Sequence, residues 1–401
     1  YNNVGNNFRD NMNQNKSKRI ESLDLLKGLI MIIMALDHVR DYFHYDAFFF
    51  DPTDPDNTNI TLYFTRWITH YCAPAFSFLA GISAFLVGRK KSKSELSAFL
   101  LKRGIWLVFI ELVVVNFSWY FDVHFSTISL LVIWSLGISM VFLAGLIHLK
   151  LKYVLIFSLL MIFGHNLLDN FPVEKGILWS IIHEFGFFTL ENGKILVVGY
   201  PIIPWIGVMS LGYYFGSFYN SNIEPLKRQK MFKLMGLISV VAFLAIRLIN
   251  SYGNLNYWKS YDTVLKTIFS FLNPAKYPPS LTYLLMTLGP ILLFLAYTEN
   301  TKGKIAKFIG VYGKVPFFYY ILHLYIIHTL ALLLAWFTNF GWQKMIITGW
   351  VTESSELKGY GLNLVYVYII WIGVVLLLYP LCKKFSAYKL NHKEKKWLSY
   401  L

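Results

Sequence analysis

The sequence is poor in charged residues and nearly free of cysteine. Asp, Glu, Lys and Arg make up only 15% of its 401 residues, whereas a soluble domain usually carries about 25%. The two cysteines, Cys72 and Cys382, lie in or beside apolar segments, so they support neither a disulfide framework nor a metal site. These shortages argue against an ordinary soluble domain.

The common catalytic motifs of soluble enzymes are also missing. The sequence has no phosphate-binding Walker loop, no dinucleotide-binding glycine fingerprint, no His-Glu-x-x-His and no paired Cys-x-x-Cys. The histidines are scattered without the spacing of metal ligands, so no metal site is predicted. Nucleic acid is not expected as a partner despite the net charge of +15, because the basic residues form short clusters between apolar runs.

Long apolar runs recur along the whole chain instead. Runs of about 18 residues or more are typical of transmembrane helices, so we expect an all-α integral membrane protein with a bundle of about ten spans. The spans are predicted at residues 22–44, 60–87, 97–120, 127–148, 152–168, 197–219, 232–250, 279–298, 308–337 and 361–381.

Basic residues are distributed unevenly between the predicted loops. If the N-terminus is cytoplasmic, the inner segments hold about 26 Lys and Arg and the outer segments about 7, so both termini are expected inside. Residues 1–19 are predicted to be a disordered arm, residues 20–382 the transmembrane domain and residues 383–401 a basic cytoplasmic tail. The outer loops are longer, and the amphipathic stretch 173–190 in one of them is predicted to be an interfacial helix.

The first predicted span carries an unusual cluster of ionisable residues in "LDLLKGLIMIIMALDHVRDYFHYD". Lys27 and His38 are eleven residues apart, which places them on one helix face about 16 Å apart along the axis. Asp37, Arg40 and Asp41 surround His38 in the sequence. Charged groups at membrane depth are costly unless they line a cavity, so we expect this cluster to do so. The alternative is that Lys27 extends to the interface and the cluster marks the helix end.

His38 is the predicted general base, because imidazole exchanges protons near neutral pH. Asp37 or Asp41 is predicted to orient it, and Asp41 has the better position because it lies three residues further along the helix. Arg40 and His44 are candidate substrate-binding residues on the same stretch.

Two later spans contribute further polar side chains. Arg66 and His70 lie four residues apart on the second span and share a face. Arg66 is predicted to bind a substrate anion or to pair with a carboxylate of the first span, and His70 either joins the catalytic group or makes a structural hydrogen bond. Tyr319 and His323 are paired in the same way on the ninth span and are candidate substrate-binding residues, although a buried His beside Tyr is more often structural.

Several blocks resemble bacterial membrane proteins related to heparan-α-glucosaminide N-acetyltransferase. They are "RIESLDLLKGLIMIIMALDHVRDYF", "RWITHYCAPAFSFLAGISAFL", "YPIIPWIGVMSLGYYFG", "KYPPSLTYLLMTLG" and "GKVPFFYYILHLYIIH", which together extend from Arg19 to His328. The first helix is also similar to that of acyltransferase family 3, in which a basic residue, ten residues and a His form a signature. Lys27 and His38 have that spacing, with Lys where Arg is usual.

The resemblance implies a multi-helix enzyme of the bacterial inner membrane that uses acetyl-CoA from the cytoplasm and acetylates a sugar reached from the other side. It also implies a catalytic polar group near the end of the first helix. Asp37 stands near an Asn of the lysosomal enzyme, and His38 and His44 both lie near the place of a later His. Lys27, Arg103 and Lys314 are the candidates to hold the CoA phosphates, because they lie toward the inner face.

The predicted function is therefore transfer of an acetyl or small acyl group from acyl-CoA to a hydroxyl or amine of a sugar or glycoconjugate. The expected partners are membrane lipid and that acceptor, with a homodimer left open. A transporter or flippase of an anionic or sugar-containing solute explains the buried charges equally well. It would favour an internal repeat with broken helices in both halves, and no repeat is visible in the sequence.

Overall fold

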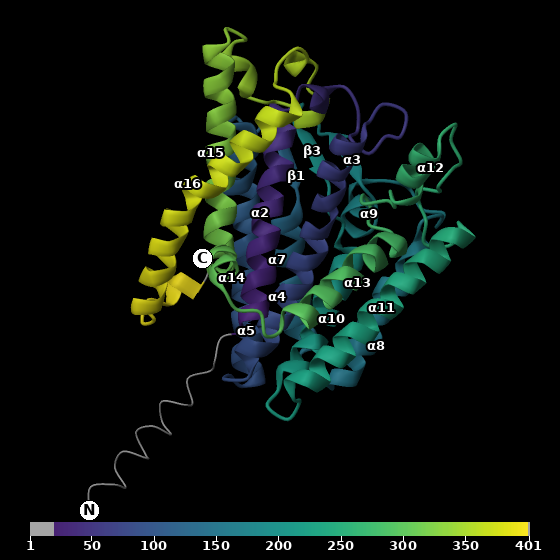
Figure 1. Cartoon of the computed structure of the whole chain (residues 1–401), viewed down its shortest axis with the longest axis vertical. Coiled ribbons are helices and arrows are strands. Elements are labelled where there is room, and N and C mark those ends of the chain that lie inside the picture. Colours follow the sequence, from purple (N-terminus) through teal and green to yellow (C-terminus); the bar gives the residue numbers. More distant parts are fainter. Residues whose placement is uncertain (1–19, 400–401) are drawn as a thin grey trace, which may run out of the picture.

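The computed structural model describes residues 20–399, and this part of the chain is mostly helical. The predicted disordered arm at 1–19 lies outside the described residues. Most helices run roughly along one direction as a bundle, and a few short elements cover one end (Figure 1).

The first half of the chain contains nine α-helices. They are α2 (Glu21–Phe43), α3 (Ile60–Trp67), α4 (Cys72–Gly88), α5 (Lys93–Ile110), α6 (Asn116–Tyr120), α7 (Val132–Leu146), α8 (Leu151–Gly164), α9 (Ile177–Ile182) and α10 (Ile202–Gly216) in the described chain. The second half contributes α11 (Pro225–Ile249), α12 (Val264–Phe271), α13 (Leu281–Thr298), α14 (Lys304–Lys314), α15 (Pro316–Phe337) and α16 (Leu364–Asn391).

Six helical stretches of the described residues are long and apolar enough to cross a membrane. They are Ile60–Gly88, Leu151–Leu168, Pro225–Ile249, Leu281–Thr298, Pro316–Phe337 and Leu364–Asn391. This finding agrees with an integral membrane protein. Each predicted span contains a helix, but the count of ten spans stays a prediction. The charged residues of α2 keep it outside the set of six, although its middle is apolar.

The predicted ninth span at 308–337 is wrong as one continuous helix. The chain breaks at Val315, whose φ of −137° and ψ of 52° are not helical, and α15 starts again at Pro316. Proline has no backbone N–H to donate and its φ suits the first turn of a helix, so it ends one helix and begins the next.

A three-stranded sheet replaces two predicted helical segments. β1 (Thr127–Leu130) pairs in parallel with β3 (Ile195–Val198), with Thr127 opposite Ile195, and β2 (Gly186–Thr189) pairs antiparallel to β3. The predicted interfacial helix at 173–190 is helical only over α9, and the span predicted from 127 begins as a strand. The β-branched and aromatic residues of these strands suit a pleated surface, and Asn192–Gly193 supplies the tight turn between β2 and β3.

α2 lies in the middle of the bundle and packs against α14, α15, α16 and α4. Its contact with α14 is very close, because a Cβ atom added at Gly28 would overlap the backbone carbonyl of Ile309 and one added at Gly313 would overlap that of Asp24. Small residues allow such close helix packing in membranes. The contact places the end of α14 beside the first turns of α2.

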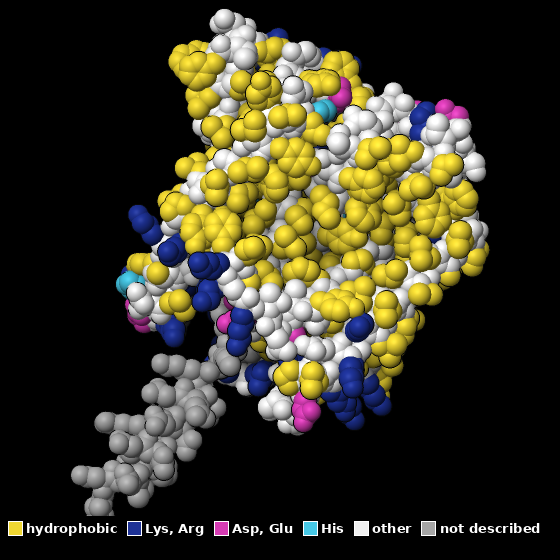
Figure 2. Space-filling view, viewed as in Figure 1, with side chains coloured by type: hydrophobic (Ala, Val, Ile, Leu, Met, Phe, Trp, Pro, Cys, Tyr) yellow, Lys and Arg dark blue, Asp and Glu magenta, His cyan; other side chains and the backbone are white. Residues whose placement is uncertain are grey.

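The surface shows a broad apolar belt with basic side chains gathered at one end (Figure 2). The loops that join α4 to α5 and α10 to α11 lie at this end, which we call the basic end (Figure 1). The strands lie toward the opposite end, which we call the sheet end (Figure 1). By the positive-inside rule we expect the basic end to face the cytoplasm.

Cysteine labelling in intact cells measures this orientation. Cys introduced at Asn57, an exposed residue of the acidic loop after α2, is expected to react with a membrane-impermeant maleimide. Cys introduced at the exposed Lys91, between α4 and α5, is expected to react only after the cells are opened. Both native cysteines are buried, so the unmodified chain is a suitable blank. The opposite labelling pattern would reverse the assigned orientation.

Candidate active site

Two cavities lie along one face of α2. The larger has a volume of about 660 Å³ and is lined on α2 by Met34, Asp37, His38, Arg40 and Asp41; we call it the sheet-end cavity. The smaller has a volume of about 280 Å³ and is lined on α2 by Lys27 and Met31; we call it the basic-end cavity. Lys27 and His38, which were predicted to share one face of this helix, therefore line different cavities: Lys27 the basic-end cavity and His38 the sheet-end cavity.

The basic-end cavity collects the three residues predicted to bind phosphate. Lys27 comes from α2, Arg103 from α5 and Lys314 from the end of α14. Lys389 of α16, which the sequence reasoning did not single out, lines the same cavity. The Lys27 ammonium donates a hydrogen bond of 2.8 Å to the Ser83 hydroxyl on α4. The remaining lining residues are mainly apolar, so the cavity combines an apolar wall with basic side chains at its rim.

Asp37 is the centre of a buried charge network in the sheet-end cavity. Arg66 donates to both carboxylate oxygens of Asp37 at 2.8 and 2.9 Å, and Arg40 donates to the same carboxylate at 2.9 Å. Arg40 also pairs with Asp41. Arg66 is held in turn by a 3.1 Å hydrogen bond to the Thr69 hydroxyl. The predicted pairing of Arg66 with a carboxylate of the first span is therefore found, with Asp37 as the partner.

His38 lies beside this network but does not take part in it. Its side chain is buried and lines the cavity, and neither ring nitrogen has a hydrogen-bond partner among the described residues. The expected orienting bond from Asp37 or Asp41 is therefore absent from this part of the chain, because both carboxylates are engaged by arginines. Trp119 packs edge-on against the ring at 4.8 Å between centroids, and aromatic packing takes the place of the expected carboxylate in positioning His38.

His323 is the other imidazole close to His38. The two ring centroids are 5.1 Å apart. The Nδ1 atom of His323 is 3.0 Å from the Tyr319 carbonyl oxygen, whereas its Nε2 atom has no partner among residues 20–399. Tyr319 stacks on His323 at 5.2 Å and is fully buried. Both residues stand behind His38 rather than among the lining residues of the cavity, so neither is placed to touch a substrate there.

Two predicted site residues are turned away from the cavity. The Nδ1 atom of His70 lies 2.9 Å from the Trp67 carbonyl, and the ring is outside the lining residues. This hydrogen bond lies within the turn of His70 itself and not between helices, and the ring is not placed to touch a substrate in the cavity. His44 is buried against Tyr45. It is also outside the lining residues of the sheet-end cavity, so it is not placed to bind a substrate there.

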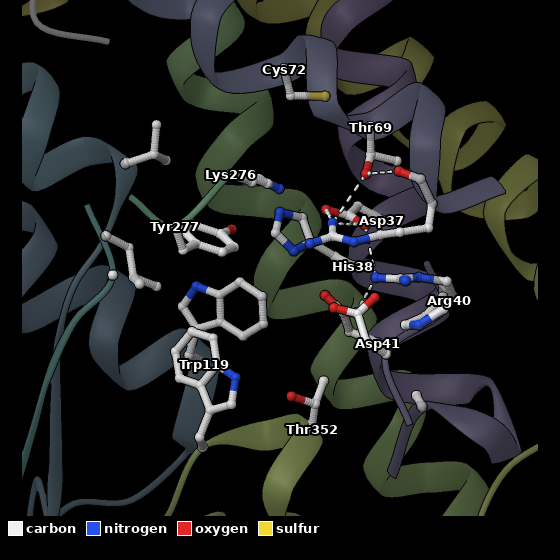
Figure 3. A pocket seen from close by; sticks show the side chains of 18 of the residues that line it. Asp37, His38, Arg40, Asp41, Thr69, Cys72, Trp119, Lys276, Tyr277 and Thr352 are labelled. Atoms are coloured by element: carbon white, nitrogen blue, oxygen red, sulfur yellow. Dashed lines mark hydrogen bonds and ion pairs between the residues drawn. The ribbon is translucent and has the colours of Figure 1, made fainter. Parts of the chain in front are cut away.

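Lys276 and Tyr277 complete the cavity from the loop before α13. Figure 3 shows both side chains pointing toward His38 from the side opposite Arg40. Burial would raise the pKa of the Tyr277 phenol, but the Lys276 ammonium and the Arg66 guanidinium outweigh it and hold the pKa below its usual value. Both residues stand in the block "KYPPSLTYLLMTLG", but neither was predicted as a site residue.

The loops after α2 and after α15 supply further lining residues. Asp51, Thr352 and Lys358 line the cavity at its mouth, and none was predicted. Burial raises the pKa of the Asp51 carboxyl, yet Arg66 and hydrogen bonds from Thr53 bring it below the usual value. Arg66 lowers the pKa of both Asp51 and Tyr277, together with Thr53 in the first case and Lys276 in the second. The cavity lining as a whole holds four Lys and Arg side chains against three Asp side chains, which is a formal excess of one positive charge.

A comparison with protein-family models finds a match to this chain. The model described as "Heparan-alpha-glucosaminide N-acetyltransferase, catalytic" matches residues 19–249, which is more than half of the chain. The chain belongs to this family. A search of curated proteins finds no match. The family points to a membrane acetyltransferase, in agreement with the resemblance seen in the sequence.

The match to the N-acetyltransferase family covers only part of the cavity wall. It includes α2 with Asp37 and His38, and it ends with α11 at Ile249. Lys276, Tyr277 and the residues of α15 lie beyond it. Within residues 20–399 no group of three or more His, Cys, Asp or Glu side chains is arranged to hold a metal ion.

A double-mutant cycle tests whether the Asp37 network is a unit. Asp37→Asn is expected to lower the free energy of unfolding by about 3–5 kcal/mol, because Arg40 and Arg66 lose the carboxylate that they share, and Arg66→Gln is expected to lower it by less, because Asp37 keeps Arg40. The double variant should lose clearly less than the sum of the two losses. The measurement is a denaturant titration in detergent micelles.

The exposed pair Lys175–Glu184 is the matched control. Its atoms are also 2.8 Å apart, but the Lys175 side chain is 67% exposed. The same cycle there should give a coupling of about 0–1 kcal/mol. A coupling between Asp37 and Arg66 as small as that of the control pair would contradict the network.

Proposed function

We propose that this chain transfers an acetyl or small acyl group from acyl-CoA, bound in the basic-end cavity, to a hydroxyl or amine of a sugar or glycoconjugate in the sheet-end cavity. The observation that carries this proposal is the shared face of α2, on which Lys27 lines the first cavity and His38 the second. The family match supports the acetyl transfer, and the acyl-CoA donor and sugar acceptor are part of the proposal.

The basic-end cavity suits the donor in shape and charge. Its rim carries Lys27, Arg103, Lys314 and Lys389, and its wall is apolar. Lys and Arg are the usual partners of phosphate groups, and the pantetheine arm is long and has few charges. The donor would enter from the cytoplasm of a bacterial cell through the basic end, with its thioester pointing toward His38.

His38 is the group best placed to act as the base. Both of its ring nitrogens are available within the described chain, and the ring lines the cavity where the acceptor would lie. In the transfer, the acceptor oxygen or nitrogen forms a bond to the thioester carbon and its proton passes to His38. The carbon–sulfur bond breaks, and the CoA sulfur leaves as a thiolate that takes up that proton.

Positive charge near His38 would stabilise the oxyanion of the tetrahedral intermediate. Lys276 points toward His38 (Figure 3), and its ammonium lies 5.0 Å from the centre of the Tyr277 ring. The indole N–H of Trp119 is also buried without a partner among the described residues, and Trp119 lines the same cavity. Preorganised donors of this kind commonly supply a large part of catalysis.

Loss of turnover in His38→Ala tests the assigned base. The rate of CoA release from acetyl-CoA in the presence of glucosamine should fall by about 10²-fold or more, because general-base catalysis is lost. His124→Ala, on an exposed residue outside both cavities, should keep the wild-type rate. Normal turnover by a well-folded His38→Ala protein would remove His38 from this role. A wild-type protein that neither hydrolyses nor transfers the acetyl group would instead favour a transporter.

Charge reversal tests the donor site separately. Arg103→Glu is expected to weaken acetyl-CoA binding by about tenfold or more, because a phosphate contact becomes a repulsion. Lys344→Glu makes the same change on an exposed residue outside both cavities and should leave binding unchanged. Isothermal calorimetry in detergent gives both affinities, with a dissociation constant between low micromolar and millimolar for the unmodified chain. Equal losses in both variants would mean that the basic end attracts CoA only through its overall charge.

A further inference from the structure

Three side chains belong to the linings of both cavities, and we call these three the wall. Phe76 of α4, Val132 of α7 and Tyr320 of α15 line both cavities. Val132 is the first residue of its helix, and Phe76 and Val132 are only partly buried. No other residue is common to the two linings in the described chain.

The position of this wall along α2 follows from the lining residues of that helix. Met31 belongs to the basic-end cavity and Met34 to the sheet-end cavity. Three residues of α-helix span about 4.5 Å, so the boundary between the cavities is about one side chain thick. An acyl thioester that reaches His38 from the basic end has to place its carbonyl carbon at this boundary.

Tyr320 and Val132 differ in size and in their place on the helices. The Tyr320 ring is packed edge-on against His323 at 5.6 Å and in parallel with Phe317 at 6.4 Å, and it is buried. Val132 stands at the beginning of α7 with a short, branched side chain. A change in its size therefore alters the opening between the cavities without removing a polar contact.

We propose that Phe76, Val132 and Tyr320 form a selectivity wall that admits a short acyl group and excludes longer ones. This inference rests on the proposed acyl transfer and adds the three residues that limit the length of the acyl group. While the thioester bond breaks and the new bond to the acceptor forms, the alkyl part of the acyl group lies among these three side chains. Each added methylene then has to displace one of them from the packed wall.

Donor competition tests the wall. The ratio of kcat/KM for butyryl-CoA to that for acetyl-CoA is measured by CoA release with glucosamine as the acceptor. Val132→Ala is expected to raise the ratio by about tenfold or more, since one methylene in an apolar pocket changes specificity by about 10- to 200-fold. Val132→Leu should lower the ratio.

Leu136→Ala is the matched comparison, one helical turn further along α7. Leu136 lines the basic-end cavity alone, so its truncation should change KM for both donors alike and leave the ratio as in the unmodified chain. An equal rise of the ratio in Leu136→Ala would place the selection in the basic-end cavity and overturn the wall. Each variant is first checked for a monodisperse elution profile, and Phe76→Leu serves as a second enlarging variant if Val132→Ala does not fold.

The outcomes separate this inference from the function on which it rests. A wild-type protein that turns over none of the acyl-CoA donors contradicts the proposed function. Acetyl transfer with the same donor ratio in Val132→Ala, Val132→Leu and Phe76→Leu contradicts only the selectivity wall.

Discussion

The buried carboxylate of Asp37 is the interaction on which the site depends. It is held by arginines from its own helix and from the next one, at 2.8 to 2.9 Å. Removing such charges from water is costly, and the cost is recovered only when each charge keeps its partner. The network therefore joins α2 to α3, and it uses up the hydrogen-bonding capacity that Asp37 would otherwise offer to His38. The imidazole is left with its nitrogens free and with aromatic side chains as its supports.

Much of the fold could be predicted because long apolar runs in a membrane protein have few alternatives to helix. Each predicted span contains a helix, and the charge cluster on the first span was correctly placed against a cavity. The strands could not be found in the same way, since four-residue strands carry little periodicity and their pairing joins residues about 70 positions apart. The break before Pro316 and the Asn192–Gly193 turn were visible as local signals and were not used.

The site was predictable where it depends on one helix and not where it depends on the path of a loop. Helical geometry alone placed Lys27 and His38 on one face, and both line cavities there. The same geometry could not predict where the His70 side chain lies, because its ring is hydrogen-bonded to a backbone carbonyl of its own turn. Lys276 reaches the cavity because the long loop before α13 passes close to α2. The path of such a loop cannot be predicted from the pattern of a single sequence.

One wide helical turn has a consequence for how this site can change. Residues Glu111–Val115, between α5 and α6, form a π-helix, which accommodates one residue more than the surrounding α-helix would. Trp119, the support of His38, follows on α6 and is fixed by the hydrogen bond that its carbonyl accepts from the Tyr42 hydroxyl at 2.5 Å. Loss of a single residue from this turn would restore an ordinary helix and rotate Trp119 by about 100° around the axis. The position of Trp119 therefore depends more on the number of residues in this segment than on their identity. A relative lacking one residue here would need a different side chain to support its imidazole.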